Sequence, residues 1–123
     1  MPEQPDQLER NLTLPGDILL LTIRRADNEA LVFVNGMKVY RKTTEGAPHL
    51  NDQVDLTEYL QPGRNIVLAV AANFTGPSNF DGNLQVNGEE VRRWHKHIPN
   101  DEHHKGIFFY DAYIIRVDSK AAA

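Results

Sequence analysis

The sequence contains V-N-G-x-x-V-x-R twice, at residues 34–41 and 86–93. Asn-Gly between two segments of alternating apolar residues is the strongest short-range signal of a β-hairpin, because a type I′ turn requires positive φ at both central positions. The pairs at 35–36 and 87–88 are therefore predicted to be hairpin tips. The residues before the two copies differ, NEAL in one case and FDGN in the other. We expect two similar hairpins, not duplicated domains, and assign neither asparagine a ligand role.

Apolar residues recur with a period of two along most of the chain, notably at 17–24 and 107–117. The segment RNIVLAVAA at 64–72 is apolar on both faces, which indicates a central strand or one covered by a partner. Many short strands separated by turn residues predict a single all-β domain, an antiparallel β-sandwich. We place it at residues 17–118, between an extended N-terminal segment (1–16) and a C-terminal tail (119–123).

Composition excludes several classes of site. The 123 residues include no cysteine, so disulfides and thiolate metal sites are absent. The net charge is −4 and the basic residues are scattered, which disfavours nucleic-acid binding. No apolar run approaches the roughly 20 residues of a membrane span, and the first residues do not form a secretory signal. We expect a cytoplasmic protein, or an exported one given without its signal.

Two segments carry a resemblance to a known family. FVNGMKV at 33–39 and VDLTEYLQPGRNIVLAV at 54–70 resemble the jelly-roll, sugar-binding-type domain that precedes the catalytic barrel of β-galactosidase- and β-glucuronidase-like glycosidases. The resemblance implies a galactose-binding-like fold and carries no catalytic residue. The (β/α)₈ barrel of those enzymes, about 250 residues, exceeds this chain. Within the matching segment, we expect Asp55 to cap a short turn, with Leu56 and Leu60 packed inward.

The segment NFTGPSNFDGN at 73–83 is predicted to be a loop. It is similar to the loop with which small bacterial calcium-dependent galactose lectins hold a metal and a sugar. That resemblance implies a ligand set of Asn73, Asn79, Asp81 and Asn83, of which the last three would bind calcium, with Phe80 available for stacking on a sugar. Calcium takes six to eight oxygen ligands, and this segment has a single carboxylate. A plain connecting loop is the favoured alternative, because the same residue types favour turns.

Four of the five histidines lie in WHKHIPNDEHHKG, at 94–106. In an extended segment, His95 and His97 project from the same side and could bind a transition metal together with His103 or His104. The spacing matches no strong zinc signature, and a solvated, histidine-rich loop is the favoured interpretation.

Two further residues have a structural and a functional interpretation. Trp94 is either a platform for a carbohydrate ring or a side chain that seals the end of the core. Asp111 interrupts the apolar face of 107–117, so it is either hydrogen-bonded within the protein or placed on the floor of a ligand pocket.

These observations predict a non-catalytic, lectin-like module that binds carbohydrate of galactose type through the 73–83 segment and a nearby aromatic side chain. Calcium is the one cofactor expected, if any is bound. The first alternative is a protein-interaction or assembly subunit, including a homo-oligomer, with no sugar ligand. The second is a small hydrolase or metal-dependent enzyme that uses the histidine-rich segment. No nucleophile and base occur together in a known catalytic motif.

Overall fold

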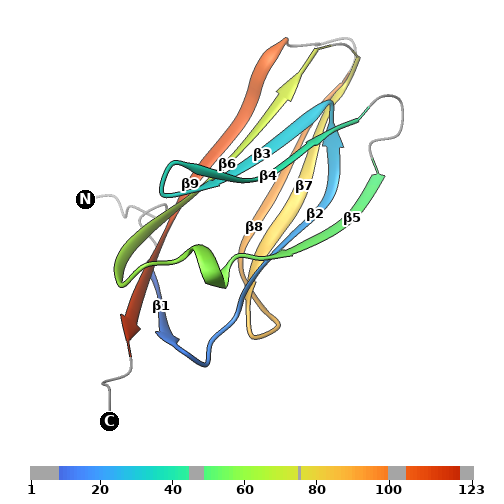
Figure 1. Ribbon diagram of the computed structural model, residues 1–123. Helices are drawn as coiled ribbons and strands as arrows, with labels where there is room; N and C mark the ends of the chain where they lie inside the picture. Colours follow the sequence, from blue (N-terminus) through green and yellow to red (C-terminus); the bar gives the residue numbers. More distant parts are fainter. Residues whose placement is uncertain (1–8, 45–48, 75, 100–104, 120–123) are drawn as a thin grey trace, which may run out of the picture.

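A computed structural model describes residues 9–44, 49–74, 76–99 and 105–119 (Figure 1). The described chain is almost entirely β-strand, with one short 3-10 helix, η2, at Thr57–Tyr59. In the described residues, no helix has the length and apolar character needed to cross a membrane. The strands are β1 (Glu9–Leu14), β2 (Leu19–Asp27), β3 (Glu29–Val34), β4 (Met37–Thr43), β5 (His49–Asp55), β6 (Gly63–Asn73), β7 (Ser78–Val86), β8 (Glu89–Ile98) and β9 (Gly106–Ser119).

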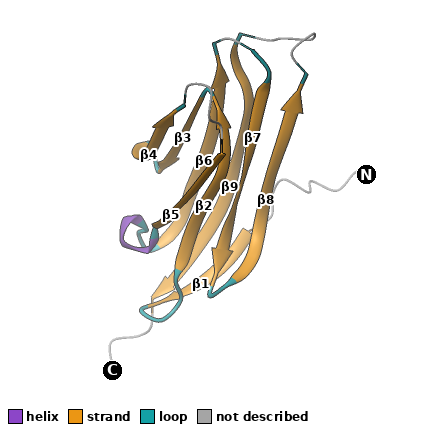
Figure 2. Cartoon of the chain, turned by 90° about the vertical axis from the view of Figure 1, so that its right-hand side faces the viewer, coloured by secondary structure: helices purple, strands orange, loops and turns teal. Residues whose placement is uncertain are grey.

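The strands form two sheets packed face to face, which confirms the predicted all-β sandwich (Figure 2). Sheet A has the strand order β1-β9-β6-β3-β4, and sheet B has the order β5-β2-β7-β8. Pairing is antiparallel except between β1 and β9, which run parallel. Consecutive strands share a sheet in two places, β3–β4 and β7–β8, and these are the hairpins predicted from the Asn-Gly pairs.

The first hairpin tip has the backbone that its sequence predicts. Asn35 and Gly36 have φ values of 52° and 84°, both in the left-handed region. The Asn35 side chain extends the sheet beyond the turn: the Ile66 N–H donates to its Oδ1 at 2.9 Å, and the Asn35 N–H donates to the Ile66 carbonyl at 2.9 Å. Its Nδ2 donates to Asn65 Oδ1 at 2.9 Å. The asparagine therefore serves both the turn and the neighbouring strand.

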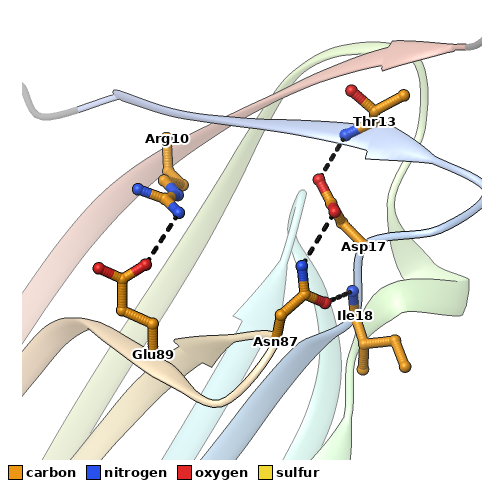
Figure 3. Close-up of polar contacts among 6 residues, drawn as sticks. All are labelled: Arg10, Thr13, Asp17, Ile18, Asn87 and Glu89. Carbon is orange, nitrogen blue, oxygen red and sulfur yellow. Dashed lines mark hydrogen bonds and ion pairs between the residues drawn. The ribbon is translucent and has the colours of Figure 1, made fainter.

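The second tip repeats this arrangement with different partners (Figure 3). The Ile18 N–H donates to Asn87 Oδ1 at 2.9 Å, and the Asn87 N–H donates to the Ile18 carbonyl at 3.0 Å. Asn87 Nδ2 donates to Asp17 Oδ1 at 3.0 Å, while the other oxygen of that carboxylate accepts the Thr13 N–H at 2.8 Å. The repeated sequence therefore has the same structural role in both places. Each asparagine forms the hairpin turn and also hydrogen-bonds to the backbone of an isoleucine in an adjacent segment.

The inward faces of the two sheets form one core. In β2 the inward side chains are Leu19, Leu21 and Ile23, each with no exposed surface. β6 is a central strand of sheet A, as one of the two interpretations of 64–72 predicted, and its alternate residues are fully buried. These are Val67, Ala69 and Ala71. The same core includes two large aromatic side chains of the opposite sheet, Phe80 and Trp94.

The sandwich begins earlier than the predicted boundary at residue 17. Residues 9–14 form β1, which pairs with the second half of β9, and Leu12 has no exposed surface. The N-terminal segment therefore supplies an edge strand of sheet A. Asp55 Oδ1 accepts the Thr57 N–H at 2.9 Å at the start of the predicted short turn, as expected, although the N-cap residue of η2 is Leu56. Hydrogen bonds from the Thr57 side chain and backbone lower the pKa of Asp55.

Polar contacts tie the two sheets together at both margins of the sandwich. At one margin, the Tyr40 hydroxyl of β4 donates to Asp52 Oδ2 of β5 at 2.7 Å. Burial and this hydrogen bond to a carboxylate raise the pKa of Tyr40 well above its ordinary value. At the other margin, Arg92 of β8 forms a two-pronged ion pair with Asp111 of β9, with contacts of 2.8 and 2.7 Å. We call this second contact, together with the Trp94 bond described below, the β8–β9 clasp.

Candidate functional site

The segment 73–83 is only partly a loop, because β7 begins at Ser78. β7 lies between β2 and β8, and pairing on both sides overrides the turn propensity of its Asn, Asp and Gly residues. The strand requires glycine at position 82, because a Cβ there would lie only 2.6 Å from the Thr22 carbonyl oxygen of the neighbouring strand. The prediction of a loop over 78–83 was therefore wrong, and the residues assigned to it project from a rigid sheet.

Alternation along β7 separates the candidate residues into two environments. Phe80 and Leu84 point into the core, with 1% and 0% exposure. Asn79, Asp81 and Asn83 have the opposite parity and lie on the outer face of sheet B.

A β-bulge in β2 brings Arg25 to this outer face. The register of β2 shifts between Ile23 and Arg25 against both neighbouring strands. Without the shift, Arg25 would share the inward parity of Ile23. With it, Ala26 takes the buried position opposite Phe80, and Arg25 lies opposite Asp81. Bulges re-aim side chains in this way and are common beside functional sites.

Pairing across three strands then creates two polar rows. The bonded row consists of Asp27, Asn79 and His97, and the open row consists of Arg25, Asp81 and His95. In the bonded row, Asn79 Nδ2 donates to Asp27 Oδ2 at 3.3 Å. Asn79 Oδ1 contacts His97 Nδ1, and because an amide oxygen only accepts, this nitrogen carries the proton. The bonded row is therefore committed to internal contacts.

Among the described residues, no hydrogen bond or ion pair joins the side chains of the open row to one another. Arg25 and Asp81 lie opposite each other, yet no ion pair within 4.0 Å joins them in the part of the chain that the structure describes. The Arg25 Nε is buried and has no hydrogen-bond partner there. His95 is exposed and lies opposite Asp81 on the other side. Arg25 and Asp81 are half-buried and His95 is exposed, so a ligand could contact the guanidinium end of Arg25, the Asp81 carboxylate and the His95 imidazole.

The two rows border a concavity of about 260 Å³. Its volume is below the range of about 300–1,000 Å³ typical of sites for drug-sized ligands. The concavity is lined by Arg25, Asn79, Phe80, Asp81, His95, Lys96 and His97. Residues that the sequence placed in two separate hypothetical sites, the 73–83 segment and the histidine-rich segment, therefore meet in one place.

Asn73 and Asn83 lie outside this concavity. Asn73 ends β6, is fully buried and donates from Nδ2 to the Gly76 carbonyl at 3.0 Å, which makes it a structural residue of the connection to β7. Asn83 is 4% exposed, and its Nδ2 donates to Glu90 Oε2 at 2.6 Å.

A calcium ion shared by Asn79, Asp81 and Asn83 does not fit this geometry. Alternate residues of a strand are about 6.6 Å apart, so Asn79 and Asn83 are separated by about 13 Å. Calcium–oxygen distances of about 2.3–2.6 Å require two ligand oxygens to lie within about 5 Å of each other. Parallel side chains that stand on a sheet cannot close the remaining gap. The resemblance to calcium-dependent lectins therefore does not extend to a shared ion at these three residues.

The histidine pair is placed as predicted, on one side of a strand. His95 and His97 belong to β8, which continues to Ile98, so the start of the expected loop is strand. His103 and His104 lie outside the described residues. Within the described ranges, no group of three histidine, aspartate or glutamate side chains could hold a metal ion.

Trp94 occupies the core, as the sealing interpretation predicted, and with 1% exposure its ring has no open face for a sugar. Its indole stacks on Phe80 with ring centroids 6.0 Å apart, and Phe80 contacts Phe109 at 5.1 Å. Trp94 Nε1 donates to Asp111 Oδ2 at 2.8 Å and completes the β8–β9 clasp. Asp111 thus accepts bonds from two side chains of the opposite sheet, as its structural interpretation predicted. The Arg92 guanidinium also lies 5.5 Å from the centre of the Tyr113 ring.

Sequence reasoning missed Arg25 because its position on the outer face depends on the bulge. The only local signal was the charged pair Arg24-Arg25 directly after an apolar strand, and it did not distinguish a strand end from a bulge.

Comparisons of the chain with protein-family models, curated protein sequences and solved structures return no match. The fold is a two-sheet antiparallel-rich sandwich, and the open row with its concavity forms the candidate site.

Proposed function

We propose that this protein is a non-catalytic carbohydrate-binding module, and that the concavity on the outer face of sheet B holds the sugar. The observation that carries the proposal is the open row. Arg25 offers N–H donors, Asp81 offers carboxylate oxygens, and His95 offers both kinds of group. Sugar hydroxyls both donate and accept, so neighbouring hydroxyls of one ring match such a mixed set.

The surroundings of the open row support this proposal. Its side chains stand on three paired strands, and sites built on strands are held more precisely than sites built on loops. The concavity of about 260 Å³ suits a small ligand such as one sugar ring. Its lining includes one carboxylate, whereas glycoside hydrolysis commonly uses two. The resemblance of residues 33–39 and 54–70 to sugar-binding-type domains points to the same ligand class.

A glycan array followed by titration of the best ligand tests the proposal. Asp81→Asn replaces a charged acceptor with an amide, and we expect at least a tenfold loss of affinity, because a hydrogen bond to a charged group contributes about 1.5–3 kcal/mol. The melting temperature should stay the same, since the Asp81 side chain forms no ion pair within the described chain and the strand pairing of its backbone is unchanged by the substitution.

Asp118→Asn is the matched control, because Asp118 is an exposed carboxylate on β9 of the other sheet. It should leave binding unchanged. A blank array, or equal affinity of Asp81→Asn and the parent for the best ligand, would contradict the proposed site. Binding should also persist in the presence of a calcium chelator.

The outer face of sheet A favours a second function, self-association. The outward residues of β6 include Ile66, which is 47% exposed, and those of β9 include Tyr110, which is 74% exposed. Apolar side chains continue across β3, β6 and β9 in register. They are Leu31, Phe33, Ile66, Leu68, Val70, Tyr110, Ala112 and Ile114. A continuous exposed apolar patch of this kind is typical of an interaction surface.

The size of this face fits a second copy of the chain. Five strands spaced about 4.8 Å apart, with a middle strand, β6, of 11 residues and roughly 36 Å, give a face of about 860 Å². Stable complexes bury about 800 Å² per partner. One copy that lies face to face on another would therefore use the whole of this sheet, as sheets in a sandwich pack on each other.

Sedimentation velocity across a concentration range tests self-association. We expect a dimer in the parent and a shift of at least tenfold in the dissociation constant for Tyr110→Glu, because the new charge must be desolvated at the interface. Gln53→Glu, an exposed substitution on β5 of sheet B, is the control and should leave the dimer intact. A parent that remains monomeric at the highest concentration removes this function.

A further inference from the structure

We propose that the concavity selects acidic sugars, with the anionic group of the ligand on Arg25 and neighbouring hydroxyls on Asp81. This inference rests on the proposed carbohydrate-binding function and names the ligand class of the same site. It starts from the guanidinium of Arg25. An arginine side chain has five N–H donors and no acceptor, and its planar fork matches a carboxylate or a sulfate.

Arg25 lines the concavity, and no ion pair within 4.0 Å neutralises its guanidinium in the described part of the chain. Its Nε is buried among protein atoms, so the terminal N–H groups of the guanidinium would hold the anionic group of the ligand. The β2 bulge directs the Arg25 side chain to this face.

Arg25 is the permanent cation that faces the concavity, and Asp81 is the carboxylate of its lining. Lys96 lies opposite Phe80 and shares its inward parity, so its side chain belongs to the other face of sheet B. An anionic group of a ligand would therefore pair with Arg25. Asp27, the nearest other carboxylate of β2, already accepts hydrogen bonds from Asn79 and Asn28. It is therefore committed to internal contacts.

Asp81 explains why the ligand should be a sugar acid and not a bare anion. Asp81 would repel a small anion, but its oxygens accept hydrogen bonds from hydroxyls next to the anionic group. Arg25 and Asp81 lie opposite each other across β2 and β7 without an ion pair within 4.0 Å in the described chain. One ligand that carries an anionic group beside free hydroxyls can therefore satisfy both side chains.

The test compares three saccharides of equal length: a neutral galacto-oligosaccharide, an oligogalacturonate and a sulfated galacto-oligosaccharide. Calorimetric titration should give at least tenfold tighter binding for one or both acidic ligands than for the neutral one. The carboxylate and sulfate arms identify which anionic group the site prefers. Arg25→Gln should remove the preference, so that acidic and neutral ligands bind alike, and Arg25→Lys should keep part of it because the charge remains without the fork.

Arg93→Gln is the matched control, since Arg93 is exposed on the same face, lies opposite Asn83 and does not line the concavity. It should leave the preference unchanged. Equal loss in Arg25→Gln and Arg93→Gln would show general attraction to a basic surface and overturn the proposal. Neutral and acidic ligands that bind equally to the parent would overturn the selectivity while the carbohydrate function stands. No binding of any saccharide at millimolar concentration would overturn both.

Discussion

Replacement of Trp94 by alanine is expected to lower the free energy of unfolding by about 3–5 kcal/mol, the range for large aromatic side chains removed from a core. Trp94 is 1% exposed and stacks on Phe80, and the structure offers no solvent-facing position for its ring. Urea denaturation followed by far-ultraviolet circular dichroism measures the loss. Because a domain is stable by only about 5–15 kcal/mol, the variant should also melt at a much lower temperature.

Arg93→Ala is the control for this prediction, because Arg93 precedes Trp94 on β8 and is exposed. It should change stability by less than about 0.5 kcal/mol. Equal stability of Trp94→Ala and the control would mean that the indole does not belong to the core. The sugar platform considered from the sequence would then be restored as an explanation.

Asp111→Ala is expected to cost about 3 kcal/mol of stability. The substitution removes the carboxylate that accepts hydrogen bonds from both Arg92 and Trp94. The side chains of Arg92 and Asp111 are largely covered, at 16% and 15% exposure. Loss of one partner of a buried ion pair commonly costs about 3–5 kcal/mol, and partial exposure places this pair at the lower end. The same denaturation experiment measures the effect.

An exposed ion pair of the same protein provides the comparison. Arg10 and Glu89 lie 3.2 Å apart with side chains 40% and 71% exposed, and Glu89→Ala should cost at most about 1 kcal/mol (Figure 3). Similar costs for Asp111→Ala and Glu89→Ala would show that the β8–β9 clasp does not hold the sheets together. Since Asp111 and Trp94 are in contact, the double variant should lose less than the sum of the single losses.

Local chemistry explains which parts of the fold the sequence could predict. The Asn-Gly tips were predictable because a type I′ turn depends on two adjacent residues, and period-two alternation identified the long strands β6 and β9. The start of β7 was not predictable in the same way. Its residues favour turns when taken alone, and only the neighbouring strands β2 and β8 make a strand of them.

The candidate site depended still more on contacts between distant segments. Alternation correctly put Asp111 on the inward face, but its partners Arg92 and Trp94 belong to the opposite sheet, and no local pattern names them. Arg25 was missed because the bulge that turns it outward is defined by register against β5 and β7. Asp81 and His95 were both candidates, yet their place in one row became visible only when β7 paired with β8.

The direction of β9 determines which way the concavity faces when the protein is attached to a support through the end of this strand. β9 starts at Gly106 opposite the end of β6, near the start of β7, and runs the length of the sandwich to Ser119 (Figure 1). The concavity is lined by residues near the start of β7 and therefore lies at the same end of the sandwich as Gly106. Ser119, where β9 ends, lies at the opposite end. An anchor attached after Ser119, on a sensor chip or a bead, would therefore direct the concavity away from the support. Many molecules tethered in this manner would present an array of outward-facing pockets to a polymer in solution.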